Sequence, residues 1–252
     1  MNILLVNDDG IFAPGIRALA EVFSGAGHRV YVCAPDRERS AASHGGTFGR
    51  PLRAEPVDYP GAEKAWAVDG MPSDCASLGL FLAGREAPVD IVVSGINRGM
   101  NLGGACVYSG TVGAAMEAAM CGTQGLAVSL CFDPREPQEE DYGAAARVAL
   151  RVAEWMPGYP LPLGVMYNLN VPAVPYEALK GIVPARLAPV FLDVPDYEPT
   201  GDGGWRYRGE PRPFENPEYD LTKIGQGYCT LTKLTWDWRL NAGDGELGEI
   251  GL

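Results

Sequence analysis

Ile3-Leu4-Leu5-Val6-Asn7-Asp8-Asp9-Gly10 is an apolar run that stops at two adjacent carboxylates and a glycine. Four apolar residues without alternation are typical of a strand that is buried on both faces, as in a parallel sheet. In sheets of this kind, ligands bind beyond the carboxyl ends of the strands. The acid pair is therefore expected where an α/β protein keeps its functional site.

The acid pair itself indicates a cation. Adjacent carboxylates such as Asp8 and Asp9 raise each other's pKa unless a positive charge lies between them. A hard divalent cation with oxygen ligands resolves this repulsion. The alternative is a polar turn that follows the strand, because Asn, Asp and Gly are ordinary turn residues. The segment alone leaves both interpretations open.

Length and composition favour a globular protein with a large core. The chain has 252 residues, of which 46% are hydrophobic, enough for one large domain or a core domain with an appendage. No apolar stretch approaches the roughly 18 residues of a membrane span, and the N-terminus lacks the pattern of a signal peptide. The six cysteines are scattered without a C-x-x-C pair, which is typical of buried thiols in a reducing cytoplasm. We therefore expect a cytoplasmic protein that does not enter a membrane.

The charge and histidine content of the chain limit which ligands it is expected to bind. A net charge of −12 argues against binding to long nucleic acid, but it does not exclude one small phosphate ester. The chain has only two histidines, which excludes a His-rich zinc centre. Any metal should therefore be held by oxygen ligands, and these favour Mg²⁺, Mn²⁺ or Ca²⁺.

Strand-like and helix-like segments alternate along the first two thirds of the chain. The expected strands are 2–6, 29–34, 90–94, 126–130 and 165–171, and the expected helices are 14–23, 73–83, 112–121 and 142–155. This alternation predicts an α/β fold with a doubly wound, mainly parallel sheet.

The pattern changes after Pro172. Frequent prolines break up any long helix, while Trp205–Arg208 and Tyr228–Leu234 resemble strands. We therefore divide the chain into a doubly wound core, residues 1–172, and a β-rich C-terminal hairpin or arm, residues 173–252. The arm is expected to pack on the core, or on another subunit.

Three loops follow predicted strands and should converge at one edge of the parallel sheet. The first holds Asp8 and Asp9, the second covers residues 34–44, and the third covers residues 94–113. Their convergence makes the three loops more informative together than singly.

The third loop ends where a helix is expected to begin, at Ser109-Gly110-Thr111. A helix start presents free N–H groups that bind phosphate well, and glycine lets the backbone approach a ligand closely. The alternative is that Ser109 or Thr111 simply caps the helix. In the same way, Asn97 and Asn101 are either ligand contacts or ordinary loop asparagines.

Four motifs in this order resemble the stationary-phase survival protein SurE family. They are Asn7-Asp8-Asp9-Gly10-Ile11; Ala34-Pro35-Asp36-Arg37 with Ser40 and Ser43-His44; Ser94-Gly95-Ile96-Asn97 with Asn101-Leu102-Gly103; and Tyr108-Ser109-Gly110-Thr111-Val112-Gly113. The resemblance covers nearly the whole chain. It implies a Rossmann-like core and a divalent-metal-dependent hydrolase of nucleoside 5′- and 3′-monophosphates, with short polyphosphate as a side substrate of some members.

The resemblance also implies roles for individual residues. One Mg²⁺ or Mn²⁺ per subunit, with bound Ca²⁺ as an alternative, would be held by Asp8, Asp9, Ser40 and Asn97. Three of these, Asp8, Asp9 and Asn97, would also act in catalysis. The phosphate-binding residues are expected to be Asn101, Ser109, Gly110 and Thr111, and the substrate site to extend to Ser43 and His44. Homodimers or homotetramers built with the C-terminal arm are implied as well.

Three positions depart from the family pattern without removing a proposed ligand. Gly45-Gly46 replaces a serine–aliphatic pair, Met71 replaces a threonine, and Ala105 stands where many members have an acid.

The main alternative to a hydrolase is a non-catalytic nucleotide or polyphosphate sensor. A dinucleotide-dependent oxidoreductase is disfavoured because the first strand is not followed by G-x-G-x-x-G.

Overall fold

The computed structural model describes residues 1–132, 140–189, 196–208 and 216–236. Its long helices are α1 (Pro14–Gly25), α2 (Pro72–Gly84), α3 (Gly110–Met120) and α4 (Tyr142–Trp155), followed by the short α5 (Asp220–Gly225). The strands of its main sheet are β1 (Asn2–Val6), β2 (Arg29–Pro35), β3 (Ala54–Val57), β4 (Lys64–Val68), β5 (Ile91–Arg98), β6 (Gln124–Cys131), β7 (Val165–Pro172), β8 (Ile182–Pro184) and β11 (Cys229–Thr235). Within the described ranges these nine strands form one sheet in the order β3-β4-β2-β1-β5-β6-β7-β11-β8.

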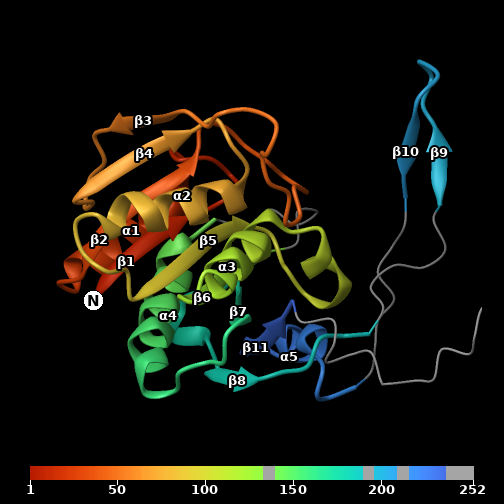
Figure 1. Cartoon of the computed structure of the whole chain (residues 1–252). Helices are drawn as coiled ribbons and strands as arrows, with labels where there is room; N and C mark the ends of the chain where they lie inside the picture. The colour runs from red at the N-terminus through yellow and green to blue at the C-terminus, as the bar shows by residue number, and fades with distance from the viewer. Residues whose placement is uncertain (133–139, 190–195, 209–215, 237–252) are drawn as a thin grey trace, which may run out of the picture.

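Helices cover both faces of this sheet (Figure 1). The side chains of Ile3 and Leu5 join the core formed with α1 and α4, whereas Leu4 and Val6 join the core formed with α2 and α3. Strand β1 pairs in parallel with both β2 and β5. The apolar run at the N-terminus is therefore buried on both faces, which is why it lacks polar alternation.

The predicted doubly wound, mainly parallel sheet is confirmed. Strand β5 continues beyond the expected 90–94 to Arg98, so Asn97 lies on the end of a strand rather than in a loop. Strands β3 and β4 were not predicted; β4 pairs in parallel with β2, and β3 pairs antiparallel with β4 at the edge of the sheet. None of the described helices is both long and apolar enough to cross a membrane.

The region after residue 172 divides into two parts. Strand β11 pairs antiparallel with β7 and parallel with β8, so this part extends the main sheet. Strands β9 (Tyr197–Pro199) and β10 (Trp205–Tyr207) form a separate antiparallel pair that stands apart from the helical layers (Figure 1). Residues 190–195, 209–215 and 237–252 of the expected arm lie outside the described residues.

Candidate functional site

A cavity of about 310 Å³ lies where the three loops meet at the carboxyl edge of the parallel strands. Its lining residues are Asp8, Asp9, Glu38, Ser40, Ala41, Asn97, Arg98, Asn101, Ala105, Tyr108 and Ser109. Six of the ten residues predicted from the sequence line this cavity. The other four, Ser43, His44, Gly110 and Thr111, are not among the lining residues.

Asp8 is held rigidly at the floor of the site. It is only 5% exposed, and Oδ1 accepts a hydrogen bond from the hydroxyl of Thr111. A Cβ on Gly110 would lie 2.9 Å from the Cβ of Asp8, so only glycine allows α3 to begin this close to the acid. Burial raises the pKa of Asp8, an effect that the hydrogen bond from Thr111 partly opposes.

Asp9 is less buried and remains titratable. Burial, with the charge of Asp8 as the next cause, raises the pKa of Asp9 to about 6. Its Oδ2 accepts a hydrogen bond from the backbone N–H of Arg98, at 3.2 Å. The guanidinium of Arg98 is itself paired with Glu140, Nη2 to Oε1 at 2.7 Å. The charge of Arg98 lowers the pKa of Asp9, but by less than burial and the charge of Asp8 raise it.

The loop after β2 is locked against both β1 and α3. The backbone N–H of Arg39 donates to the carbonyl of Asp8 at 2.7 Å. Ser43 donates from Oγ to the carbonyl of Val107 at 2.7 Å, and His44 Nε2 lies 2.7 Å from Glu117 Oε2. These bonds hold in place the loop that carries Ser40 to the lining of the cavity.

Asn97 and Asn101 differ in how strongly hydrogen bonds tie them to the rest of the structure. Asn97 donates from Nδ2 to the carbonyl of Gly99 at 2.9 Å, which leaves its amide oxygen as a ligand atom. Asn101 is buried and donates from Nδ2 to Ser129 Oγ at 2.8 Å. The carbonyl of Asn101 accepts from Nδ2 of both Asn168 and Asn170. Asn101 is therefore part of the scaffold as well as of the wall.

The structure shows a capping role for Ser109. Its Oγ accepts a hydrogen bond from the backbone N–H of Val112 at 3.1 Å, so Ser109 is the N-cap of α3. Thr111 has a different role, because its hydroxyl is bound to Asp8.

The sequence did not single out Glu38 or Asp220. Glu38 lines the cavity next to the acid pair. Asp220 is fully buried, and it accepts hydrogen bonds from the backbone N–H groups of Gly103 at 2.8 Å and Ala188 at 3.1 Å. Through Asp220 the C-terminal region holds the third loop in place. No motif marked either residue; each is recognised only through the contacts of the folded chain.

The donor set fits a hard cation. Carboxylates from Asp8 and Asp9, a hydroxyl from Ser40 and an amide from Asn97 surround one cavity, and all four offer oxygen. The described residues contain no group of three or more His, Cys, Asp or Glu side chains placed to hold a metal. A cation held here would therefore rely on two carboxylates and neutral oxygens, as Mg²⁺ commonly does.

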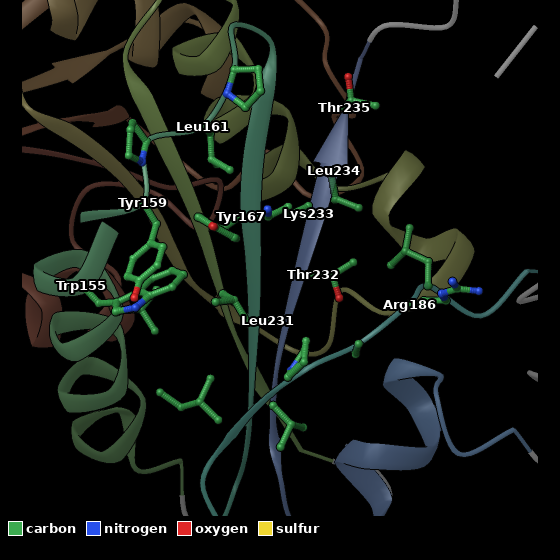
Figure 2. Close-up of a pocket in the computed structure, with 18 of the residues that line it drawn as sticks. Trp155, Tyr159, Leu161, Tyr167, Arg186, Leu231, Thr232, Lys233, Leu234 and Thr235 are labelled. Atoms are coloured by element: carbon green, nitrogen blue, oxygen red, sulfur yellow. The ribbon is translucent and has the colours of Figure 1, made fainter. Parts of the chain in front are cut away.

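A larger cavity of about 1200 Å³ lies between the C-terminal end of α4 and strands β7, β8 and β11 (Figure 2). Its walls are mainly apolar and aromatic, with Trp155, Tyr159 and Tyr167 on one side. None of its lining residues is an acid. It therefore lacks the carboxylates that a divalent cation requires.

The fold and the site together define a doubly wound α/β protein with an acidic, oxygen-lined pocket at the carboxyl edge of its parallel strands. Residues 3–191 match the family model described as Survival protein SurE. The 5′-nucleotidase SurE of Gloeobacter violaceus is 42% identical and covers 98% of this chain and 95% of its own length. The 5′-nucleotidase SurE of Thermosynechococcus vestitus is 40% identical and covers 99% of this chain and 96% of its own length.

A solved structure agrees with these relatives. The crystal structure of SurE protein from Aquifex aeolicus superposes with a TM-score of 0.80, at 32% identity, over 93% of each chain. The chain belongs to the SurE family, which confirms the resemblance recognised in its motifs.

The raised pKa of Asp9 gives a testable pH dependence of stability in metal-free protein. The folded state binds this proton more tightly than the unfolded state, so the stability it contributes is present below about pH 4 and is lost as the pH rises through about 6. We expect Asp9→Asn to raise the free energy of unfolding by about 1 to 2 kcal/mol at pH 7.5 in EDTA, with little change at pH 4. Urea denaturation at both pH values measures this.

Asp58→Asn is the matched control, because Asp58 is exposed and does not line the cavity. It should leave stability unchanged at both pH values. Destabilisation by Asp9→Asn at pH 7.5 would contradict the view that the two carboxylates strain the metal-free protein.

Proposed function

We propose that this chain is a 5′-nucleotidase, a phosphoric monoester hydrolase that releases nucleoside and phosphate from nucleoside monophosphates with the help of one bound divalent cation. The observation that carries the proposal is that Asp8 and Asp9 line one cavity together with Ser40 and Asn97, which offer further oxygen atoms. The pKa values of both acids are raised there. The printed names of the relatives, 5′-nucleotidase SurE, support the same activity. We extend the proposal to 3′-monophosphates and, as a side activity, to short polyphosphate.

Asp8, Asp9, Ser40 and Asn97 would hold the cation, which we expect to be Mg²⁺ or Mn²⁺, with Ca²⁺ as an alternative. Bound there, it supplies Lewis-acid polarisation of a phosphoryl oxygen and a lowered pKa for an attacking water. Asp8, whose carboxyl accepts a hydrogen bond from Thr111, would supply one of the two carboxylates to the bound cation. Asp9, which is less buried, orients the attacking water and accepts its proton.

The start of α3 would receive the phosphate. The first N–H groups of a helix have no partner within the helix, and they carry its positive dipole end. Gly110 and Thr111 occupy this first turn, beside Asp8. Ser109 and Asn101 line the cavity at the same end, so the phosphate oxygens would meet backbone N–H groups and neutral side chains there. Ser43 and His44 would shape the rim of the substrate site through the loop that they anchor.

We also propose a cytoplasmic location. All six cysteines are free thiols, and five of them are buried. Such thiols are typical of proteins that fold in a reducing compartment.

Phosphate release from adenosine 5′-monophosphate tests the activity. We expect EDTA to abolish hydrolysis and Mg²⁺ or Mn²⁺ to restore it. Asp8→Asn keeps the shape of the side chain but removes its charge, and should lower kcat by at least about a hundredfold. Asp58→Asn should turn over normally. Binding of the nucleotide without any turnover in the wild type would favour a sensor instead, and a screen of all nucleoside monophosphates would define base and position.

A second experiment separates capping from phosphate binding at Ser109. Ser109→Ala should cost about 1 kcal/mol of stability through loss of the cap, and should also raise KM for the substrate or weaken inhibition by free phosphate. Asp141→Ala is the matched control, because Asp141 caps α4 through the N–H of Gly143. It should cost similar stability without a kinetic effect. Unchanged kinetics in both variants would leave capping as the whole role of Ser109.

We propose that the chain forms a homodimer or homotetramer through the C-terminal hairpin. Strands β9 and β10 stand apart from the core in Figure 1, and Tyr197 and Trp205 are 54% and 69% exposed. An isolated two-stranded pair is marginal in water, and a second copy related by two-fold symmetry is a common solution.

Light scattering should therefore give a mass of at least twice 26.9 kDa. Trp205→Ser combined with Tyr197→Ser should lower that mass while metal binding persists. Phe81→Ser, which removes an equally exposed ring from α2, should not. A strictly monomeric wild type at micromolar concentration would refute the proposal.

A further inference from the structure

Glu38 is an acid of the cavity that the metal-ligand set does not use. It follows β2 in the loop that carries Ser40, and both side chains line the pocket with Asp8 and Asp9. The flanking Arg37 and Arg39 pair with Asp36 rather than with Glu38. Among the ion pairs of the described ranges, none involves Glu38.

The partner of Glu38 is instead the hydroxyl of Ser40. Ser40 Oγ donates to Glu38 Oε1 at 2.5 Å, a short bond of the kind that hydroxyl groups form with carboxylates. A serine hydroxyl has one hydrogen and two lone pairs. With the hydrogen committed to Glu38, the lone pairs of Ser40 are left for another group.

This arrangement suits a cation ligand. A hydroxyl that is free to rotate can turn its hydrogen toward a bound cation, and the ligand is then lost. Carboxylates that accept a hydrogen from a ligating group fix the orientation of that group and increase its basicity. The charge of Glu38 also interacts with the acid pair, because it is one of the causes that raise the pKa values of Asp8 and Asp9.

We propose that Glu38 is a positioning residue, which holds the hydroxyl of Ser40 with its lone pairs facing the cavity and thereby strengthens cation binding through Ser40. This inference rests on the proposed function, because it takes Ser40 as a ligand of the cation. It differs from two simpler roles for Glu38: direct ligation of the cation, and a general contribution of negative charge.

A double-mutant cycle on Mn²⁺ binding separates these roles. Calorimetric titration of metal-stripped protein gives the dissociation constant for the wild type, Glu38→Ala, Ser40→Ala and the double variant. We expect Glu38→Ala to weaken Mn²⁺ binding about tenfold, in the range typical of groups that support a metal ligand. In the Ser40→Ala background the same change should have no further effect, because the group through which Glu38 acts is gone.

Two further variants sharpen the test. Glu38→Gln keeps an oxygen that accepts the hydrogen from Ser40, so it should bind Mn²⁺ more tightly than Glu38→Ala. Glu63→Ala removes an exposed acid outside the cavity and should bind as the wild type does. Circular dichroism confirms that each variant is folded before it is titrated.

The outcomes are distinct. Wild-type affinity in Glu38→Ala would overturn the inference, and so would an equal loss in the Ser40→Ala background, which indicates direct ligation. A Gln variant as weak as the Ala variant would assign the effect to charge alone and would also overturn it. If the wild type bound no Mn²⁺ at all, the proposed function would fail with it, a result that cannot be confused with a loss confined to Glu38.

Discussion

Two adjacent carboxylates held at the end of a buried strand are the constraint on which this site depends. Asp8 and Asp9 are fixed by the course of β1, which is paired on both sides and covered on both faces. They cannot separate without disrupting the sheet. Burial raises the pKa values of both acids, and the charge of Asp8 raises that of Asp9 further, so in the absence of a cation the site holds unfavourable electrostatic energy. That energy is what a cation would relieve, and binding would be correspondingly favourable.

The surrounding elements are arranged to keep this strain in place. Thr111 ties Asp8 to the first turn of α3, and the absence of a side chain at Gly110 lets that turn approach the acid. The N–H of Arg39 ties the second loop to the carbonyl of Asp8. A Cβ on Gly113 would lie 2.4 Å from the carbonyl oxygen of Ser43, so the same helix also packs against the second loop. Two carboxylates, a helix start and a hydroxyl group are thus brought together at one cavity by three loops.

Much of this arrangement was predictable because its causes are local. The double-sided burial of β1 leaves an unbroken apolar run, and the helical spacing of apolar residues between Pro14 and Phe23 marks α1. Convergence of the three loops follows from parallel strands, whereas the choice of Ser40 and Asn97 within those loops came from the resemblance to the SurE family. Metal ligation by them remains a prediction.

The remainder was not predictable because its causes are not local. Strand β3 has only four residues, one of them proline, and β4 has five. The hydroxyl of Thr111 finds Asp8 across 103 positions of sequence, so a capping or phosphate role was the natural expectation. Glu38 lines the cavity through the path of the second loop, and further along this loop Ala41 and Ser43 take positive φ values of 56° and 53°, which the sequence does not signal.

The C-terminal region is connected to the site more closely than a separate arm would be. Asp220, at the start of α5, accepts from the N–H of Gly103 in the third loop. In the same loop, the carbonyl of Asn101 accepts hydrogen bonds from Asn168 and Asn170 on β7. Strand β7 is itself paired with β11. The wall of the cavity therefore depends on strands and a helix that come from both ends of the chain. Because buried amide and carboxylate groups must keep their partners, a change in the packing of β11 or α5 would reach the third loop through these bonds. Any assembly formed through the C-terminal region would thus act on the same elements that hold Asn97 and Asn101 beside the acid pair.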